Sequence, residues 1–270
     1  MTLATYELGL RLGTFVSVFA LMAAWELASP ARAPRLGRLR RWRTNLGLAA
    51  LNVLVLRLAL PGTTLIAASV AQAHGWGLVN GMRLSGLPGV LVAIVLLDLA
   101  LFLQHVLFHN VPALARVHAV HHADLDFDVT TGLRFHPVEI MISALIRFAA
   151  VVVLGAPVAA VLVFEVLLNA TSMFNHSNVS LPGWLEHRIR WILVTPDMHR
   201  IHHSVAKSER NSNFGFCLPI WDRLLGTYTA TAAGVLDIGL SAWRDPATVA
   251  SLGGVLRMPF AQESYSRKEQ

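Results

Sequence analysis

Four apolar stretches, each about as long as a membrane-spanning helix or longer, most strongly constrain the fold of this chain. They are Leu8 to Leu27, Asn45 to Ala73, Leu87 to Phe108 and Val138 to Phe174. A helix needs about 20 predominantly apolar residues to cross the hydrocarbon core of a bilayer. Only 14% of the 270 residues are charged, compared with about a quarter in typical soluble proteins. The sequence therefore predicts an integral membrane protein.

The fourth stretch is long enough for two helices. Gly155, Ala156 and Pro157 interrupt its middle, which predicts a turn and a helical hairpin with both ends on one side of the membrane. Arg147 and Glu165 each lie nine positions from Ala156. Because charges inside a membrane usually pair, we expect an ion pair between them. The predicted fold class is an all-α integral membrane protein, with about three spanning helices plus this hairpin and a cytoplasmic, histidine-rich helical cap.

Basic residues determine the predicted orientation. Six arginines lie between Arg32 and Arg43, directly after the first apolar stretch, and such clusters are typical of cytoplasmic loops. Ten further Lys or Arg residues follow residue 177, so the C-terminal part is also expected in the cytoplasm. The net charge of +6 is thus explained by membrane orientation, and no nucleic acid partner is expected. Many arginines, few lysines and a short chain favour a bacterial inner membrane.

Eight histidines on the expected cytoplasmic side form three clusters with helical spacing. One HxxxH sequence is followed by two HxxHH sequences, and their members are His105, His109, His118, His121, His122, His199, His202 and His203. Residues three or four apart share one face of a helix, so each cluster can direct its imidazoles at a common point. Eight nitrogen ligands are too many for one tetrahedral zinc ion. The pattern therefore predicts two metal ions.

Further polar residues are expected near these clusters. His136 precedes the hairpin and His176 follows it, so both should lie at the depth of the clusters and belong to the predicted ligand set. Three carboxylates are predicted to orient ligand side chains, namely Asp98, Asp197 and Asp222. For Asp98 the alternative is a buried pair with Arg57. A last group alternates along a loop and is expected to form a solvated acidic face or to orient ligands: Asp124, Asp126 and Asp128.

The motifs around the histidines resemble those of the fatty acid hydroxylase superfamily, also called the sterol desaturase family. The resemblance covers roughly residues 88 to 229 and includes HVLFH, HAVHH, TTGLRFHP, FNHSN, TPDMHRIHHS and WDRLLGTY. In the first cluster Val106 stands where many members have an arginine, which leaves the substrate subclass open. The resemblance divides the chain into N-terminal transmembrane helices with the arginine-rich loop (1–87), a catalytic domain (88–229) and a cytoplasmic C-terminal tail (230–270).

The resemblance implies a membrane-bound, non-haem di-iron oxygenase that hydroxylates or desaturates a lipid, such as a fatty acyl chain, a sterol-like lipid or an ether lipid. The implied cofactors are two iron ions, with zinc as an alternative occupant after purification. The implied partners are the lipid substrate, O₂ and a separate electron donor, either a reductase or a ferredoxin. Cleavage of an unactivated C–H bond needs an oxidant that side chains cannot supply, so the chemistry belongs to the cofactor.

A histidine-rich membrane protein that binds or transports metal is the alternative function. Transporters usually carry their ligands near mid-membrane, whereas these clusters are expected at the cytoplasmic edge. A zinc hydrolase would need an HExxH sequence, which none of the clusters contains. Cys217 is the single cysteine, which excludes an intrachain disulfide and thiolate metal clusters.

Overall fold

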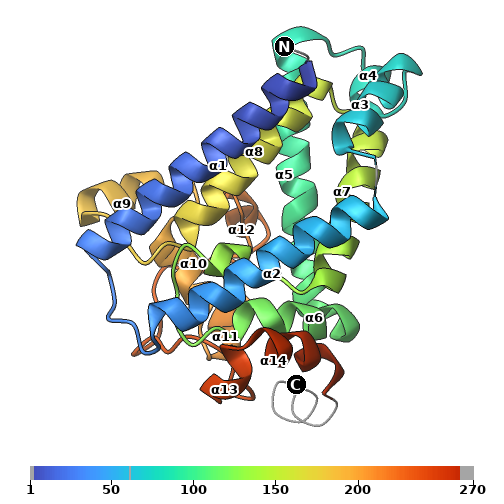
Figure 1. The fold of residues 1–270 in the computed structure, drawn as a ribbon. Coiled ribbons are helices and arrows are strands. Elements are labelled where there is room, and N and C mark those ends of the chain that lie inside the picture. Colours follow the sequence, from blue (N-terminus) through green and yellow to red (C-terminus); the bar gives the residue numbers. More distant parts are fainter. Residues whose placement is uncertain (1–2, 61, 262–270) are drawn as a thin grey trace.

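The computed structural model describes residues 3–60 and 62–261, and these residues form helices but no strand of a sheet. The long helices are α1 (Leu3–Ala28), α2 (Arg38–Ala59), α5 (Gly86–Asn110), α7 (Pro137–Leu154) and α8 (Val158–Asn175), and the ten-residue α3 (Thr64–Ala73) packs against α7 and α8. The short ones are α4 (Leu78–Gly81), α6 (Pro112–His122), η1 (Thr131–Leu133), α9 (Gly183–Ile189), α10 (Pro196–His202), α11 (Lys207–Arg210), α12 (Ile220–Leu224), α13 (Pro246–Val249), α14 (Leu252–Arg257) and η2 (Met258–Phe260). Most short helices gather at one end of the long ones (Figure 1). We call this end, formed by residues 111–136 and 176–261, the cap.

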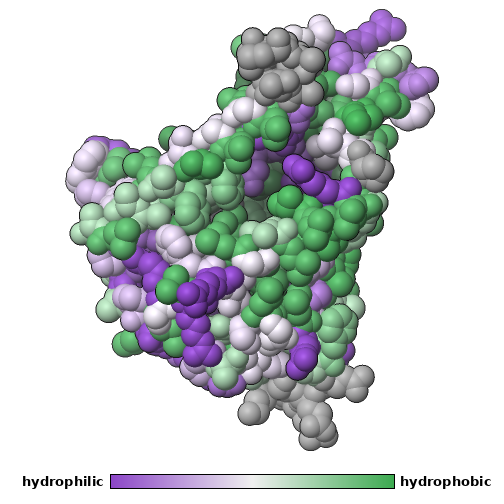
Figure 2. Space-filling model, viewed as in Figure 1, coloured by the Kyte–Doolittle hydropathy of each residue, from purple (hydrophilic) through white to green (hydrophobic). Residues whose placement is uncertain are grey.

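The described residues include five candidate membrane spans by length and composition: Glu7–Ala28, the stretch Arg38–Gly81 that contains α2, α3 and α4, and the helices Gly86–Asn110, Pro137–Leu154 and Val158–Asn175. Their outward faces carry exposed leucines, such as Leu54, Leu91 and Leu145, which suit contact with lipid rather than water. Figure 2 shows apolar side chains over much of α1 and α2. The chain is therefore an all-α integral membrane protein, as the sequence predicts.

The second apolar stretch is not one helix, contrary to the expectation for Asn45 to Ala73. α2 ends at Ala59 and α3 begins at Thr64. A residue before a proline is disfavoured in the helical region, and Leu60, which precedes Pro61 in the sequence, has φ −126° and ψ 82°. As a result α2 runs obliquely out of the cap, and α3 packs beside α7 and α8 at the opposite end (Figure 1).

The predicted hairpin forms between α7 and α8. Gly155 ends α7 with φ 62°, a left-handed conformation that glycine adopts without strain. Gly77, with φ 90°, lies against this turn, and a Cβ atom on Gly77 would be 2.1 Å from the backbone nitrogen of Gly155. The close approach of these two backbones joins the hairpin turn to the segment before α4, at the end opposite the cap.

The predicted ion pair between Arg147 and Glu165 is wrong. Glu165 instead pairs with Arg11 of α1 and accepts a hydrogen bond from the hydroxyl of Thr64 at 2.7 Å. The physical reason is the position of α1, which runs along α8 (Figure 1) and brings Arg11 to Glu165. The equal distances of Arg147 and Glu165 from the hairpin turn could not reveal this partner. Arg147 lines a cavity described below.

A buried charge network joins α2 to the cap. Arg41 is 1% exposed, and its Nε and Nη2 groups donate to the two carboxylate oxygens of Asp124, both at 2.7 Å. Its Nη1 group donates to Asp128 at 2.5 Å. Burial opposes ionisation of Asp124, but the Arg41 guanidinium more than offsets this effect and holds the pKa of Asp124 well below its usual range.

The alternating aspartates are buried, so the expectation of a solvated acidic face is wrong. Asp126 accepts the backbone N–H groups of Arg35 and Leu36, both at 2.8 Å. Glu26, near the end of α1, similarly accepts the backbone N–H groups of Val129 and Asn178 at 2.7 Å. The arginine-rich loop and α1 are thereby attached to the segments that carry the histidines.

We expect Asp124→Asn to lower the free energy of unfolding by about 3 kcal/mol, because it leaves the buried Arg41 guanidinium short of one charge partner. This corresponds to a fall in Tm of roughly 10 °C. The folded-state pKa of Asp124 is depressed, so its stabilisation is present above the unfolded pKa of about 3.9 and is lost as the pH falls through the folded value. Thermal unfolding in detergent at neutral pH measures the effect.

The matched control is Asp237→Asn, since the Asp237 side chain is 43% exposed in its pair with Arg35. An exposed pair contributes about 0–1 kcal/mol, so this variant should unfold near the wild-type temperature. Equal destabilisation by both substitutions would contradict the importance of the buried network.

We expect Gly77→Ala to destabilise the protein more than Gly75→Ala. Both residues have positive φ, which costs an L-residue about 1–2 kcal/mol. A Cβ atom at Gly77 also collides with the backbone of Gly155, whereas nothing lies within 4 Å of one at Gly75. Thermal unfolding of the two variants separates the effect of the collision from that of the backbone strain. Equal Tm values would show that the backbone at Gly155 moves to accommodate the Cβ atom at no cost in stability.

Candidate metal centre

Nine histidines form two adjacent groups at the inner face of the cap. The first group is His105, His109, His118, His122 and His202, and the second is His121, His176, His199 and His203. In each group the candidate ligand atoms lie within 4.8 Å of one another. The rings of His122 and His203, from different groups, stack with centroids 4.4 Å apart. Nine of the ten predicted ligands therefore come together, in an arrangement that could hold two metal ions side by side.

Helical spacing sorts the histidines between the groups. In each HxxHH sequence the two outer histidines are four residues apart and share one group, while the middle histidine belongs to the other. For α6 the outer pair is His118 and His122, in the first group, and for α10 it is His199 and His203, in the second. Both short helices thus contribute to both groups, so neither group can form without the other helix in place.

Oxygen acceptors orient five of these rings through Nδ1. Four acceptors are backbone carbonyl oxygens and one is a carboxylate, at distances of 2.6–3.2 Å from Nδ1. The pairs are His105 with Phe214, His121 with Arg134, His176 with Ser172, His202 with Ser212, and His118 with the carboxylate of Glu139. Because a backbone carbonyl or a carboxylate oxygen accepts the hydrogen bond, each of these Nδ1 atoms carries the proton. The neutral ring then keeps its lone pair on Nε2, which is the atom that can bind a metal.

The Nε2 atoms of these oriented rings converge. His105 Nε2 lies 3.2 Å from His118 Nε2 and 3.1 Å from His202 Nε2, and His121 Nε2 lies 3.2 Å from His176 Nε2. With the protons held on Nδ1, these contacts bring lone pairs together and cannot be hydrogen bonds. The buried nitrogens His109 Nε2 and His203 Nε2 have no partner in the described residues. Cations at the two centres would satisfy these atoms, so the donor set fits two metal ions.

The surroundings also keep the rings neutral. Burial, together with the nearby rings, lowers the pKa values of His121, His122, His199 and His203 well below the usual range, and burial lowers the pKa of His202 to about 3. Imidazole must be deprotonated to bind a metal. At neutral pH the cap therefore presents ligands that need not lose a proton first.

Two residues important for the site were missed in the sequence. Glu139, in the first turn of α7, accepts from His118 Nδ1 at 2.6 Å, and an acidic residue at the start of an apolar helix is a recognisable signal. Arg134 is fully buried and donates to Val120, Asn45 and Val249 at 2.7–2.9 Å, which ties together α6, α2 and α13. Its own carbonyl orients His121.

The three predicted orienting carboxylates differ in role. Asp222 accepts the backbone N–H of Phe214 at 2.8 Å and so supports the carbonyl that orients His105. Asp98 accepts from Trp221 Nε1 at 2.8 Å and from two backbone N–H groups of the same segment, so the alternative pair with Arg57 is wrong. The third, Asp197, pairs with Arg200 on its own helix and contacts no ligand ring, which corrects its predicted role.

His136 does not join either group. Its Nδ1 accepts the backbone N–H of Val138 at 3.1 Å, as the N-cap of α7, and its Nε2 faces the carbonyl of Leu256 at 3.3 Å. Both ring nitrogens therefore have protein partners. The segment after residue 229, predicted as a tail, supplies this contact, and its described part, residues 230–261, is a folded part of the cap that packs against α2 and α6.

A cavity of about 400 Å³ leads from the membrane helices to the first histidine group. Its walls come from α1, α2, α5, α7 and α8, and its inner end is lined by His105, His118 and Glu139. The surface is hollowed between α1 and α2 (Figure 2). The volume is typical of sites for small organic ligands, and the walls are mostly apolar. The arrangement can bring one part of a lipid-soluble molecule beside the histidines.

Comparison with known proteins gives a consistent result. A sequence model of the fatty acid hydroxylase family matches residues 90–227, which include all nine grouped histidines, Asp98, Glu139 and Asp222. No solved structure matches.

Three curated proteins illustrate the similarity. An ornithine lipid hydroxylase of Rhizobium tropici is 32% identical over 154 residues, which cover 56% of this chain and 45% of that protein. An alkylglycerol monooxygenase of Xenopus tropicalis is 29% identical over 144 residues, covering 52% and 30%. Human cholesterol 25-hydroxylase is 29% identical over 142 residues, covering 51% and 50%. The chain thus spans half or less of the length of these relatives.

We expect the purified protein to contain about two metal ions per chain, one for each group. The double variants His105→Ala/His109→Ala and His199→Ala/His203→Ala each remove an i, i+4 pair from one group and should retain about one ion. Elemental analysis of protein from iron-replete cells, with circular dichroism to verify folding, provides the measurement.

The controls are His74→Ala, which is exposed at the opposite end of the molecule, and His136→Ala. Both should retain the full metal content. Loss of metal from His136→Ala would overturn its exclusion from the ligand set, and one ion bound by the wild type would overturn the two-centre arrangement.

Proposed function

Since the chain belongs to the fatty acid hydroxylase family, we propose that it is a membrane-bound, non-haem di-iron oxygenase that hydroxylates a lipid with O₂ and external electrons. The observation that carries the proposal is the apolar cavity that ends at His105 and His118. The three relatives are named as hydroxylases or monooxygenases of an ornithine lipid, an alkylglycerol and cholesterol. These names favour hydroxylation over desaturation.

The nine grouped histidines would hold two iron ions through their free ring nitrogens. Imidazole is a suitable ligand for iron. Bound iron would supply the reduction of O₂ and the oxidant for an unactivated C–H bond. The protein must then bind the lipid, exclude water and hold protons in defined positions.

The cavity walls would bind the lipid and limit its approach. Phe15 of α1 and Val53 and Leu56 of α2 line its membrane side, and Phe108 and Phe216 line its inner part. A lipid can enter between α1 and α2 without leaving the bilayer. These two helices lie outside residues 90–227, so the identity of the lipid does not transfer from the relatives.

Glu139 would hold a proton in place beside the reacting end of the cavity. Its Oε1 accepts from His118 Nδ1 at 2.6 Å, which fixes the tautomer that leaves His118 Nε2 for metal. Its Oε2 is buried without a partner in the described residues. Carboxylates in this position typically strengthen metal binding by the histidine they contact.

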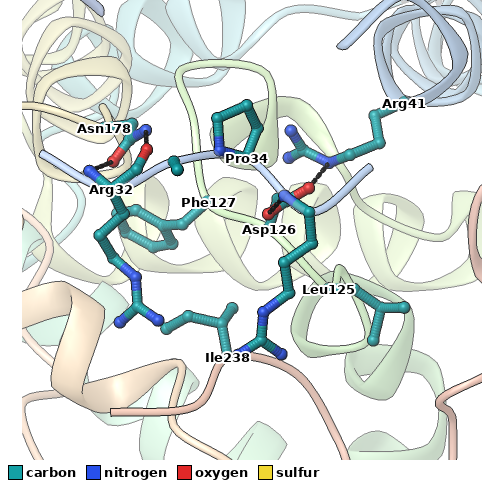
Figure 3. A pocket seen from close by; sticks show the side chains of 10 residues that line it. Arg32, Pro34, Arg41, Leu125, Asp126, Phe127, Asn178 and Ile238 are labelled. Atoms are coloured by element: carbon teal, nitrogen blue, oxygen red, sulfur yellow. Dashed lines mark hydrogen bonds and ion pairs between the residues drawn. The ribbon is translucent and has the colours of Figure 1, made fainter. Parts of the chain in front are cut away.

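Electrons would come from a separate reductase or ferredoxin that docks on the cap. Arg32 and Arg35 line a surface pocket, in which Figure 3 shows Arg32, and basic surfaces attract acidic redox proteins. Phe127 lines the same pocket, and its ring stacks on that of His176 with centroids 5.7 Å apart. The surface and the second histidine group are thus separated by one aromatic side chain at this point.

The cap would face the cytoplasm of a bacterial cell, from the inner membrane. The arginine-rich loop lies at the cap end (Figure 1), as the positive-inside rule requires for this orientation. We retain residues 88–229 as the catalytic domain, with α1 and α2 completing the cavity and the described residues 230–261 packing against α2 and α6. In the alternative function, metal transport, ligands would be expected near mid-membrane, whereas seven of the nine grouped histidines belong to cap helices or follow the hairpin.

We expect the iron-loaded protein, reconstituted in vesicles of bacterial lipid with a ferredoxin and its reductase, to incorporate one atom from ¹⁸O₂ into a lipid. Mass spectrometry of the extracted lipids detects the labelled product, and His202→Ala should abolish it because it removes a first-group ligand. His74→Ala is the matched control with full activity.

Loss of two hydrogens without ¹⁸O would indicate desaturation instead. No modified lipid, combined with uptake of iron or zinc into sealed vesicles, would overturn the proposal in favour of transport.

A further inference from the structure

We propose that Arg147 binds an oxyanion of the lipid substrate, a carboxylate or a phosphate, and thereby selects which carbon reaches the histidines. The inference rests on the proposed function and goes further, since it gives the chemical class of the substrate and a specificity-determining residue. It starts from a membrane arginine that lacks the acidic partner expected for it.

Arg147 lies within α7, seven residues before the helix ends at Leu154, and its side chain lines the cavity. Its expected partner, Glu165, is occupied by Arg11 and Thr64. In the part of the chain that the structure describes, no carboxylate contacts Arg147. A charged side chain inside a membrane is costly, and such residues usually face a cavity and mark a functional site.

The protein offers no other anion in this part of the cavity. Glu139 is the one carboxylate among the described lining residues, and it is engaged by His118. It lies eight residues before Arg147, which is about 12 Å along the helix axis. The cavity therefore has a permanent cation in its outer part and needs an anion from the ligand.

Neighbouring groups suit an oxyanion. Ser143 lies one turn before Arg147 on the same helix face, and its hydroxyl accepts from Gln104 Nε2 at 3.0 Å, which leaves its O–H free to donate. A guanidinium remains charged at all physiological pH values and matches carboxylate and phosphate with two parallel hydrogen bonds. A neutral lipid could not compensate this charge.

The separation between Arg147 and the inner end of the cavity gives a molecular ruler. An extended chain advances about 1.2 Å per bond, so about 12 Å along α7 corresponds to roughly ten bonds. With the oxyanion at Arg147, a carbon roughly ten bonds away would lie beside His105 and His118. The reacting position would then be counted from the anionic group rather than from the chain end.

The test compares three amphiphiles that share a sixteen-carbon alkyl chain: hexadecanoate, hexadecyl phosphate and hexadecanol. Native mass spectrometry of the full-length, iron-loaded protein measures their binding, and argon excludes O₂ so that no turnover occurs. The wild type should bind at least one of the two anions about tenfold or more tightly than the alcohol, the ratio expected for a charge-assisted hydrogen bond. Arg147→Gln should remove this preference, and Arg147→Lys should restore part of it because it keeps the charge without the planar fork.

The matched control is Arg57→Gln, which replaces an exposed arginine of α2 that does not line the cavity and should leave the preference unchanged. Preference for hexadecanoate alone would identify a carboxylate site, and for hexadecyl phosphate alone a phosphate site. Equal binding of alcohol and anions by the wild type, or a preference that survives Arg147→Gln, would overturn the inference.

Product analysis separates this inference from the proposed function. If ¹⁸O is incorporated into anionic lipids, wild type should label a carbon roughly ten bonds from the oxyanion, and Arg147→Gln should give a mixture of positions. Unchanged regiochemistry in Arg147→Gln would refute the role of Arg147 while supporting the oxygenase. An intact anion preference without any ¹⁸O product would refute the oxygenase while supporting the anion site.

Discussion

The cap is organised by one requirement, that the grouped imidazole rings, five of which are held through Nδ1, stay neutral and keep their lone pairs directed at two common points. A protein meets this requirement by holding the other ring nitrogen against an oxygen. The carbonyl of Phe214 does so for His105, and Asp222 in turn holds Phe214. The carbonyl of Arg134 orients His121 while its buried guanidinium joins three segments of the chain. The elements around the site therefore stabilise the fold and orient the ligands through the same contacts.

The membrane helices lie next to the same histidine groups and form the cavity that leads to them. They form an apolar cavity that opens between α1 and α2 and ends at the first histidine group. A lipid-soluble molecule can reach the histidines through this cavity without crossing water. The buried contact of Arg41 with Asp124 fixes α2 to the cap, so the wall of the cavity and the ligand-bearing loop are positioned together.

Sequence reasoning succeeded where the signal was local. The turn at Gly155 follows from a glycine and a proline two residues later, both of which disfavour a continuous helix, and the presence of His118 and His122 in one candidate metal group follows from their spacing on one helix. It failed where a partner came from a distant segment. Glu165 pairs with Arg11, which is far away in the chain, and His136 was assigned to the centre by its depth, although it caps α7 instead.

The sequence by itself determined that the chain is helical and membrane-embedded, because long apolar stretches leave no other way to satisfy the backbone in lipid. It also determined the identity of eight of the candidate ligands, because histidines at helical spacing share a face whatever surrounds them, and it predicted the ninth, His176, from its position after the hairpin. Only the tertiary structure decided how these ligands divide into two groups, which carbonyls and carboxylates orient them, and that Arg147 is left to face a cavity. Those outcomes depend on which helices lie side by side, and contacts between distant segments leave no periodic trace in a single sequence.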